Sequence, residues 1–156
     1  MSPAIRLLAC GAIDRGDDAV ALHAMRGLPG AAREAARIEE VGYLSPEQLI
    51  GDAPHTRRLV VDCVAGLAAG AIVDVSLAEL PALEREAGAT STHALAPGAA
   101  VAIAARLGAV RPDDRFVGIG GVSFEPGDGL SPAVWAGLPA LIMRIAERVR
   151  EAARCA

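Results

Sequence analysis

The sequence predicts an α/β fold of three layers, in which a twisted, mostly parallel sheet of five strands lies between helices. Short apolar runs alternate along the chain with segments of helical spacing. The apolar runs lack polar alternation, which is typical of strands covered on both faces. The chain has 156 residues, enough for one domain, and no internal repeat or linker divides it. We therefore expect a single domain over residues 1–156.

The first predicted strand covers residues 4–11, a mostly apolar run that ends at a glycine. Helical spacing follows over 19–28, where Val20, Met25 and Leu28 can share one face, and Pro29-Gly30 ends this helix. Residues 31–36 are ambiguous and compatible with more helix.

The sequence patterns in residues 37–64 predict two further strands with one short helix between them. Residues 37–42 form a weak strand candidate, because polar residues interrupt it. Ser45-Pro46-Glu47-Gln48 matches a capping box with proline at the first helical position, which predicts a short helix to about Ile50. Residues 59–64 are apolar without alternation, as in a central strand.

The remaining elements follow from the same patterns. We expect a strand at 70–75 and a surface loop over the polar, alanine-rich residues 80–92. A helix over 94–107 tolerates Pro97 only in its first turn, where a missing N–H costs little. Glycine-rich residues 115–122 predict the last strand, with close backbone approach. Ser131-Pro132 opens the longest helix, whose apolar stripe comprises Val134, Leu138, Leu141, Ile142, Ile145 and Val149.

Composition excludes several classes of function. The net charge of -4 and the pI near 5.3 give no basic surface for nucleic acid. Three cysteines far apart argue against a disulfide framework or a zinc ribbon and fit reduced thiols in the cytoplasm. No run approaches the roughly 20 apolar residues of a membrane span, and no signal peptide is visible. We expect a soluble cytoplasmic protein without a membrane partner.

Polar residues gather at the predicted junctions between strands and helices. Asp17 and Asp18 stand in the turn after the first strand, Asp62 ends an apolar run, and His93 precedes a helix. In a doubly wound sheet, strand ends and helix starts share one edge, where ligands bind. We therefore expect these side chains to meet at that edge.

Each of these residues also has a purely structural interpretation. Asp17 or Asp18 can cap the following helix, although only one of two adjacent carboxylates can cap well. Asp62 can pair with Arg57 or Arg58, since an unpaired buried charge would cost several kcal/mol, roughly. A histidine at a helix start is often a cap or a surface residue. His23 and His55 lie in a helix and a polar loop, and we expect neither to act.

Together, Asp18, Asp62 and His93 form a set of two carboxylates and one imidazole, which suits a divalent first-row metal with open positions. A phospho-signalling receiver domain also has an acidic pair after its first strand and an aspartate after a central strand. It needs a lysine at the end of its last strand, however, and all 15 cationic residues of this chain are arginine. The composition decides against that alternative.

At this point the sequence resembles the maturation endopeptidases of nickel–iron hydrogenases. Members open with a strand, a Gly-x-Gly-Asn-x-x-x-Gly-Asp-Asp/Glu turn and a helix, and residues 9–18 here follow that pattern in part. The other matching blocks, in the family's order and spacing, are 59–64, 91–95 with 105–108, 116–119 and 125–132. The resemblance covers nearly the whole chain.

The resemblance implies a phosphorylase/hydrolase-like fold and a cytoplasmic endopeptidase. Such an enzyme removes a C-terminal extension from the hydrogenase large-subunit precursor after nickel insertion. The family's metal-contact positions fall on Asp18, Asp62 and His93, which become the expected catalytic and metal-binding residues. Nickel would arrive with the substrate as a recognition tag, and no permanent cofactor is expected. The metal could polarise the scissile carbonyl, a carboxylate could activate water, or both could contribute.

Three departures from the family pattern lie near the same edge. Ala12 replaces the family's asparagine, Glu40-Val41-Gly42 stands for its Asp-Gly-Gly, and Gly121-Val122 replaces its Pro-Glu. These changes leave open a divergent relative that binds a nickel-loaded partner without cleaving it.

Overall fold

The computed structural model describes residue 3 and residues 5–88 and 96–156. Its five strands form one sheet in the order β2-β1-β3-β5-β4. The strands are β1 (Ile5–Cys10), β2 (Ala36–Val41), β3 (Arg57–Ala65), β4 (Ile72–Ser76) and β5 (Arg115–Gly121). The pairings β1–β2, β1–β3 and β3–β5 are parallel, and only β4 runs antiparallel, at the edge. The predicted five-stranded, mostly parallel α/β fold is confirmed.

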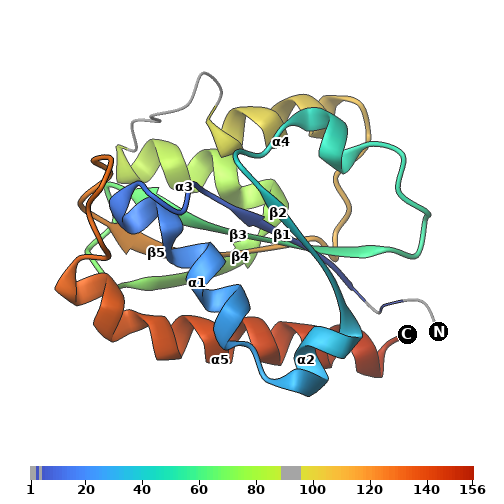
Figure 1. The fold of residues 1–156 in the computed structure, drawn as a ribbon. Helices are drawn as coiled ribbons and strands as arrows, with labels where there is room; N and C mark the ends of the chain where they lie inside the picture. Colours follow the sequence, from blue (N-terminus) through green and yellow to red (C-terminus); the bar gives the residue numbers. More distant parts are fainter. Residues whose placement is uncertain (1–2, 4, 89–95) are drawn as a thin grey trace.

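Helices cover both faces of this sheet (Figure 1). The α-helices are α1 (Val20–Gly27), α2 (Gly30–Ala35), α3 (Leu80–Ala87), α4 (Pro97–Arg106) and α5 (Pro132–Arg154). Short 3₁₀ helices are η1 (Gly16–Ala19), η2 (Pro46–Leu49) and η3 (Leu77–Glu79). Figure 1 shows α1, α2 and α5 on one side of the sheet and α3 and α4 on the other. Among the described residues, no helix is long and apolar enough to cross a membrane.

Each face of the sheet carries its own apolar core. The face under α1 and α5 is built largely of small and branched side chains, with the predicted stripe of α5 among them. Val134, Leu141, Ile145 and Val149 are fully buried there. The opposite face packs Leu8, Val60 and Phe116 against α4 and the short helices. Both faces of β1, β3 and β5 are therefore covered, which explains their unbroken apolar runs.

The sequence-based expectation of a surface loop over 80–92 is wrong for its first part, because residues Leu80–Ala87 form α3. Leu80 is fully buried against the α4 side of the sheet, and Pro81 lies in the first turn, where proline is tolerated. Ser76 donates its backbone N–H to Glu79 Oε2 at 2.8 Å, so that a capping-box pattern precedes the helix. Residues 89–92 lie outside the described residues.

A buried ion pair joins the amino-terminal ends of β3 and β5. The Arg58 guanidinium, fully buried, donates from Nε to Asp114 Oδ1 at 3.1 Å, and Asp114 is fully buried as well. Arg58 also donates to the carbonyls of Leu49 and Ala109. Because every polar group of the pair has a partner, the two charges are tolerated in the core.

Removing one member of this pair should therefore be far more damaging than removing its exposed neighbour. We expect Asp114→Ala to lower the free energy of unfolding by about 3–5 kcal/mol, because it removes the hydrogen-bonded counter-ion of the buried Arg58 guanidinium and leaves only the Asp52 carboxylate, at 3.6 Å. Asp113→Ala removes only a 3.9 Å contact of the 70% exposed Asp113 with Arg57 and should cost less than about 1 kcal/mol. Urea unfolding of both variants measures the difference. Equal losses would contradict this account.

Candidate functional site

A tight turn after β1 brings Asp18 back against the end of that strand. Gly11 and Gly16 have φ values of 129° and 57°, a region that side chains rarely adopt. A Cβ on Gly11 would lie 1.9 Å from the Asp18 carbonyl oxygen, so the close approach requires glycine. The backbone N–H of Ala12 donates to Asp18 Oδ2 at 3.0 Å. Even with alanine in place of the family's asparagine, the turn therefore orients the Asp18 carboxylate.

Asp17 and Asp18 do not act as helix caps. The residue before η1 is Arg15 and the residue before α1 is Ala19, and neither start has a side-chain cap. The capping interpretation of the acidic pair is therefore wrong. Both aspartates are buried, with exposed fractions of 0% and 5%. They are used in different ways.

The Asp17 carboxylate holds the turn after β5 and the start of α5. It accepts hydrogen bonds from the backbone N–H groups of Val122 at 2.9 Å, Ser123 at 3.0 Å and Ser131 at 2.7 Å. The Ser131 hydroxyl donates to it at 2.9 Å. Burial opposes the charge of Asp17, but these donors outweigh it and lower the pKa of the carboxyl. Asp17 is therefore a structural anion at the edge of the site.

Asp62 lies in β3, opposite Gly118 of β5 and near the carboxyl end of the sheet. It is 5% exposed and accepts a hydrogen bond from the Cys63 N–H at 2.8 Å. The alternative of an arginine partner is not realised, since Arg58 binds Asp114 and Arg57 contacts Asp113. Burial, followed by the repulsion of Asp18 and Glu84, raises the pKa of Asp62 to about 8. The protonated form of Asp62 is therefore favoured at neutral pH.

Glu84 is a third carboxylate at this place that the sequence analysis missed. It stands on α3, and both of its carboxylate oxygens accept the Gly98 N–H at the start of α4, at 3.1 and 3.0 Å. Burial raises the pKa of Glu84. The residue was overlooked because residues 80–92 were expected to form a loop. The pattern from Ser76 to Glu79, followed by Pro81, was the signal that could have revealed α3.

Two thiols border the carboxylates without being reactive. Burial and then the charges of Asp62 and Asp18 raise the pKa of Cys10 well above its usual value. Cys63 is affected in the same direction, first by burial and then by Asp62. Because the thiolate is the nucleophilic form, neither cysteine is suited to nucleophilic catalysis.

Asp18 and Asp62 thus come together at the carboxyl-end edge, as the sequence predicted, while the third predicted ligand cannot be placed. His93 lies outside the described residues. Within 3, 5–88 and 96–156, no group of three histidine, cysteine, aspartate or glutamate side chains is arranged to hold a metal ion. The set of Asp18, Asp62 and His93 therefore stays a prediction, to which the structure contributes two neighbouring carboxylates.

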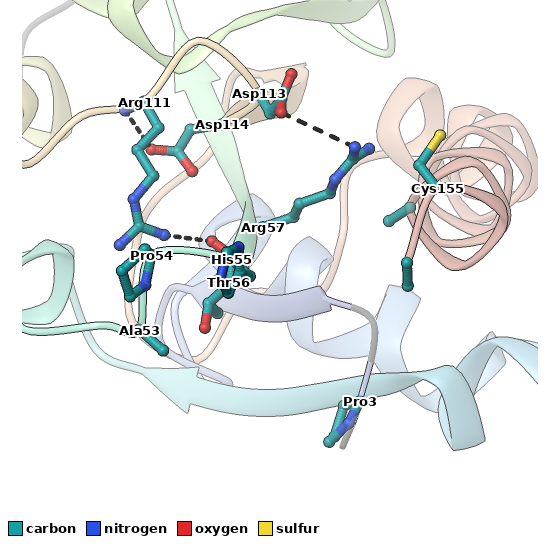
Figure 2. A pocket seen from close by; sticks show the side chains of 12 residues that line it. Pro3, Ala53, Pro54, His55, Thr56, Arg57, Arg111, Asp113, Asp114 and Cys155 are labelled. Atoms are coloured by element: carbon teal, nitrogen blue, oxygen red, sulfur yellow. Dashed lines mark hydrogen bonds and ion pairs between the residues drawn. The ribbon is translucent and has the colours of Figure 1, made fainter. Parts of the chain in front are cut away.

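A pocket of about 660 Å³ lies at the opposite, amino-terminal edge of the sheet (Figure 2). Two of its charged side chains are engaged within the protein: Arg111 donates to the carbonyls of Thr56 at 2.5 Å and Asp52 at 3.0 Å, and Asp114 binds the buried guanidinium described above. Arg57 faces Asp113 across the pocket in Figure 2. Among the described residues that line this pocket, no hydrogen bond joins an acid to a base or nucleophile, so the carboxylates at the other edge are the candidate site.

Comparison with known proteins bears on the fold. The sequence matches no protein-family model, and it matches no curated protein. Solved structures do match. The hydrogenase maturating endopeptidase HybD from E. coli superposes with a TM-score of 0.70 at 24% identity, covering 94% of this chain and 92% of that one.

Two other solved structures are similar over a comparable length. The NiFe hydrogenase maturation protease HybD from Thermococcus kodakarensis has a TM-score of 0.65 and 25% identity, with 93% of this chain and 97% of that chain covered. An endopeptidase from Escherichia coli gives 0.65 and 22%, with coverage of 94% and 93%. The chain therefore has the fold of the hydrogenase maturation endopeptidases, which confirms the fold that the resemblance of its sequence motifs implies.

Proposed function

We propose that this protein is an endopeptidase that removes the C-terminal extension of a nickel–iron hydrogenase large-subunit precursor after nickel insertion. The observation that carries the proposal is the meeting of Asp18 and Asp62, both 5% exposed, at the carboxyl-end edge of this fold. The structural neighbours named as maturation endopeptidases support the reaction class. The proposal places the enzyme in the cytoplasm, without a nucleic-acid or membrane partner.

Nickel would enter as part of the substrate. Two carboxylates suit a divalent cation because their negative charges offset that of the ion, and His93 would add an imidazole donor. A cation between Asp18 and Asp62 would relieve the repulsion that keeps Asp62 protonated. Asp62 would then become an available carboxylate only when the nickel-loaded precursor is bound, which would make nickel a recognition tag.

Three chemical roles are compatible with this arrangement. The metal can polarise the scissile carbonyl, a carboxylate can act as general base on water, or both can contribute. Asp18 has a backbone N–H on one oxygen, and Asp62 has the Cys63 N–H. Both carboxylates are thus oriented before substrate arrives.

A non-cleaving relative that binds a nickel-loaded partner is the second candidate. The observation in its favour is that the family's carboxylate after the second strand is displaced here: Glu40 lies within β2 and is exposed. The same substrate distinguishes the two candidates, because binding without cleavage would select this one.

We predict that Asp18→Ala, Asp62→Ala and His93→Ala each abolish cleavage of the nickel-loaded precursor while the fold is kept. Each change removes a proposed metal contact, so we expect a loss of cleavage rate of at least about 100-fold. His23→Ala is the control, since His23 lies on α1 and has no proposed role. Mass spectrometry of the precursor measures the truncation, and circular dichroism measures the fold. Normal processing by one of the three variants would remove that residue from the site.

The raised pKa of Asp62 predicts a pH-dependent stability. The pKa of the Asp62 carboxyl is near its ordinary value of 3.8 in the unfolded chain and about 8 in the folded protein. Between these values the folded state binds the extra proton, so Asp62 makes the protein less stable as the pH rises from 4 to 8. We therefore expect Asp62→Asn to gain stability relative to the unmodified protein across this range, by at most about 1.4 kcal/mol per pH unit, and to keep the gain above it.

The control for this measurement is Asp74→Asn. Burial works against the charge of Asp74, but Arg148, Arg115 and Arg144 lower its pKa, so its contribution to stability is lost only as the pH falls through the acidic range. Between pH 5 and 9, the stability difference between this variant and the unmodified protein should stay constant. Urea unfolding without metal provides both curves. If the stability difference between Asp62→Asn and the unmodified protein did not change with pH, the pKa of Asp62 would not be raised in the folded protein.

A further inference from the structure

Arg15 lies in the loop of residues 11–18, which follows β1 and carries Asp18. The loop holds its backbone on both sides, because Arg15 N–H donates to the Ala12 carbonyl at 3.3 Å and the Arg15 carbonyl accepts Asp18 N–H at 3.1 Å. Gly16 follows, and a Cβ there would lie 2.5 Å from the Ser123 carbonyl oxygen. The position of Arg15 relative to Asp18 is therefore fixed by the same turn that orients the Asp18 carboxylate.

The guanidinium of Arg15 has no partner in the part of the chain that the structure describes. Its Nε is buried without a hydrogen bond, and no ion pair or other hydrogen bond of this side chain is found there. The side chain is half-buried. A guanidinium that loses water without gaining an acceptor is unfavourable, so a half-buried, unpaired arginine indicates a missing anion.

Four other buried or half-buried arginines have hydrogen-bonding partners among the described residues. Arg6 binds Glu39 and Asp52, Arg58 binds Asp114, Arg111 binds two carbonyls, and Arg148 binds Asp74 and Glu151. Arg115 also has a buried Nε without a hydrogen bond, but its Nη2 binds Asp74 at 2.8 Å. Arg15 differs because its whole guanidinium lacks a partner among the described residues, and it lies in the loop that carries Asp18.

Apolar side chains accompany Arg15 on the neighbouring backbone. Ile13, two residues before it, is 47% exposed, and Val122, whose N–H binds the Asp17 carboxylate, is 65% exposed. Asp17 fastens the turn of Val122 to the turn of Arg15, so the two apolar residues and the arginine belong to adjoining loops. A peptide segment that combines apolar side chains with a carboxylate would complement such a surface.

We propose that Arg15 binds a carboxylate of the substrate segment and so determines which peptide is presented to Asp18 and Asp62. This rests on the proposed peptidase function and names the part of the substrate that is recognised. The carboxylate is either an aspartate or glutamate side chain of the C-terminal extension or the terminal carboxylate itself. A guanidinium binds both in the same bidentate way.

The test compares Arg15→Gln and Arg15→Lys with the control Arg26→Gln, an exposed arginine in the last turn of α1. Binding of the nickel-loaded precursor is measured by calorimetry, and cleavage by steady-state kinetics. We expect Arg15→Gln to raise KM and Kd about tenfold or more with kcat little changed, Arg15→Lys to recover part of the affinity, and Arg26→Gln to match the unmodified protein.

The substrate is varied in parallel to locate the carboxylate. One set of precursors has each acidic residue of the extension changed to its amide, and another has an amidated C-terminus. The unmodified protein should lose about tenfold in affinity for one of them, whereas Arg15→Gln should bind that precursor and the original equally. The precursor that binds more weakly to the unmodified protein but not to Arg15→Gln lacks the carboxylate that Arg15 recognises, and so identifies its source.

The outcomes separate this proposal from the proposed function. Unchanged KM and Kd for Arg15→Gln, with normal cleavage by the unmodified protein, would overturn the role of Arg15 alone. Arg15-dependent binding without cleavage would support Arg15 and reject the peptidase. Failure of the unmodified protein to bind the precursor would reject both. A fall in kcat alone would show that Arg15 does not act through substrate binding.

Discussion

The candidate site depends on one buried anion whose charge is compensated by hydrogen bonds from the protein itself. Asp17 receives hydrogen bonds from Val122, Ser123 and Ser131, and so ties the turn after β1 to the loop that leads into α5. Because these donors compensate the charge, a carboxylate can stay ionised although it is fully buried. These hydrogen bonds fix the turn after β1, which also contains Asp18, the residue directly after Asp17. They also hold Val122 at the same edge of the sheet.

Asp62 shows the opposite physical situation. Among the described residues, one backbone N–H donates to its carboxylate, and burial together with the neighbouring carboxylates raises its pKa to about 8. Asp17 thus has a lowered pKa and Asp62 a raised pKa, although both lie at the same edge of the sheet. Strongly shifted pKa values of this kind are typical of functional sites. Arg15 adds the same kind of incompleteness with the opposite charge.

Much of this arrangement could be predicted from local patterns. Apolar runs located β1, β3 and β5, the Ser45 pattern located the turn that became η2, and glycines next to aspartates located the edge where Asp18 and Asp62 meet. The prediction failed at α3, because its charged residues Glu84, Arg85 and Glu86 and its alanines made the segment resemble a polar surface loop. The helical spacing of Leu80, Leu83 and Ala87 was present in the sequence, and the structure buries Leu80 and joins Glu84 to the start of α4.

Local sequence patterns were sufficient to predict the fold class, the edge of the sheet that carries the candidate site, and the residue types gathered there, because strand and helix patterns are local and strand ends of parallel sheets must coincide. How each charge is used could be read only from the folded protein. Asp17 and Asp18 are neighbours with the same side chain, yet one binds a loop more than 100 residues away and the other faces the site. Which donors reach a carboxylate depends on contacts between distant segments, and no local pattern records them.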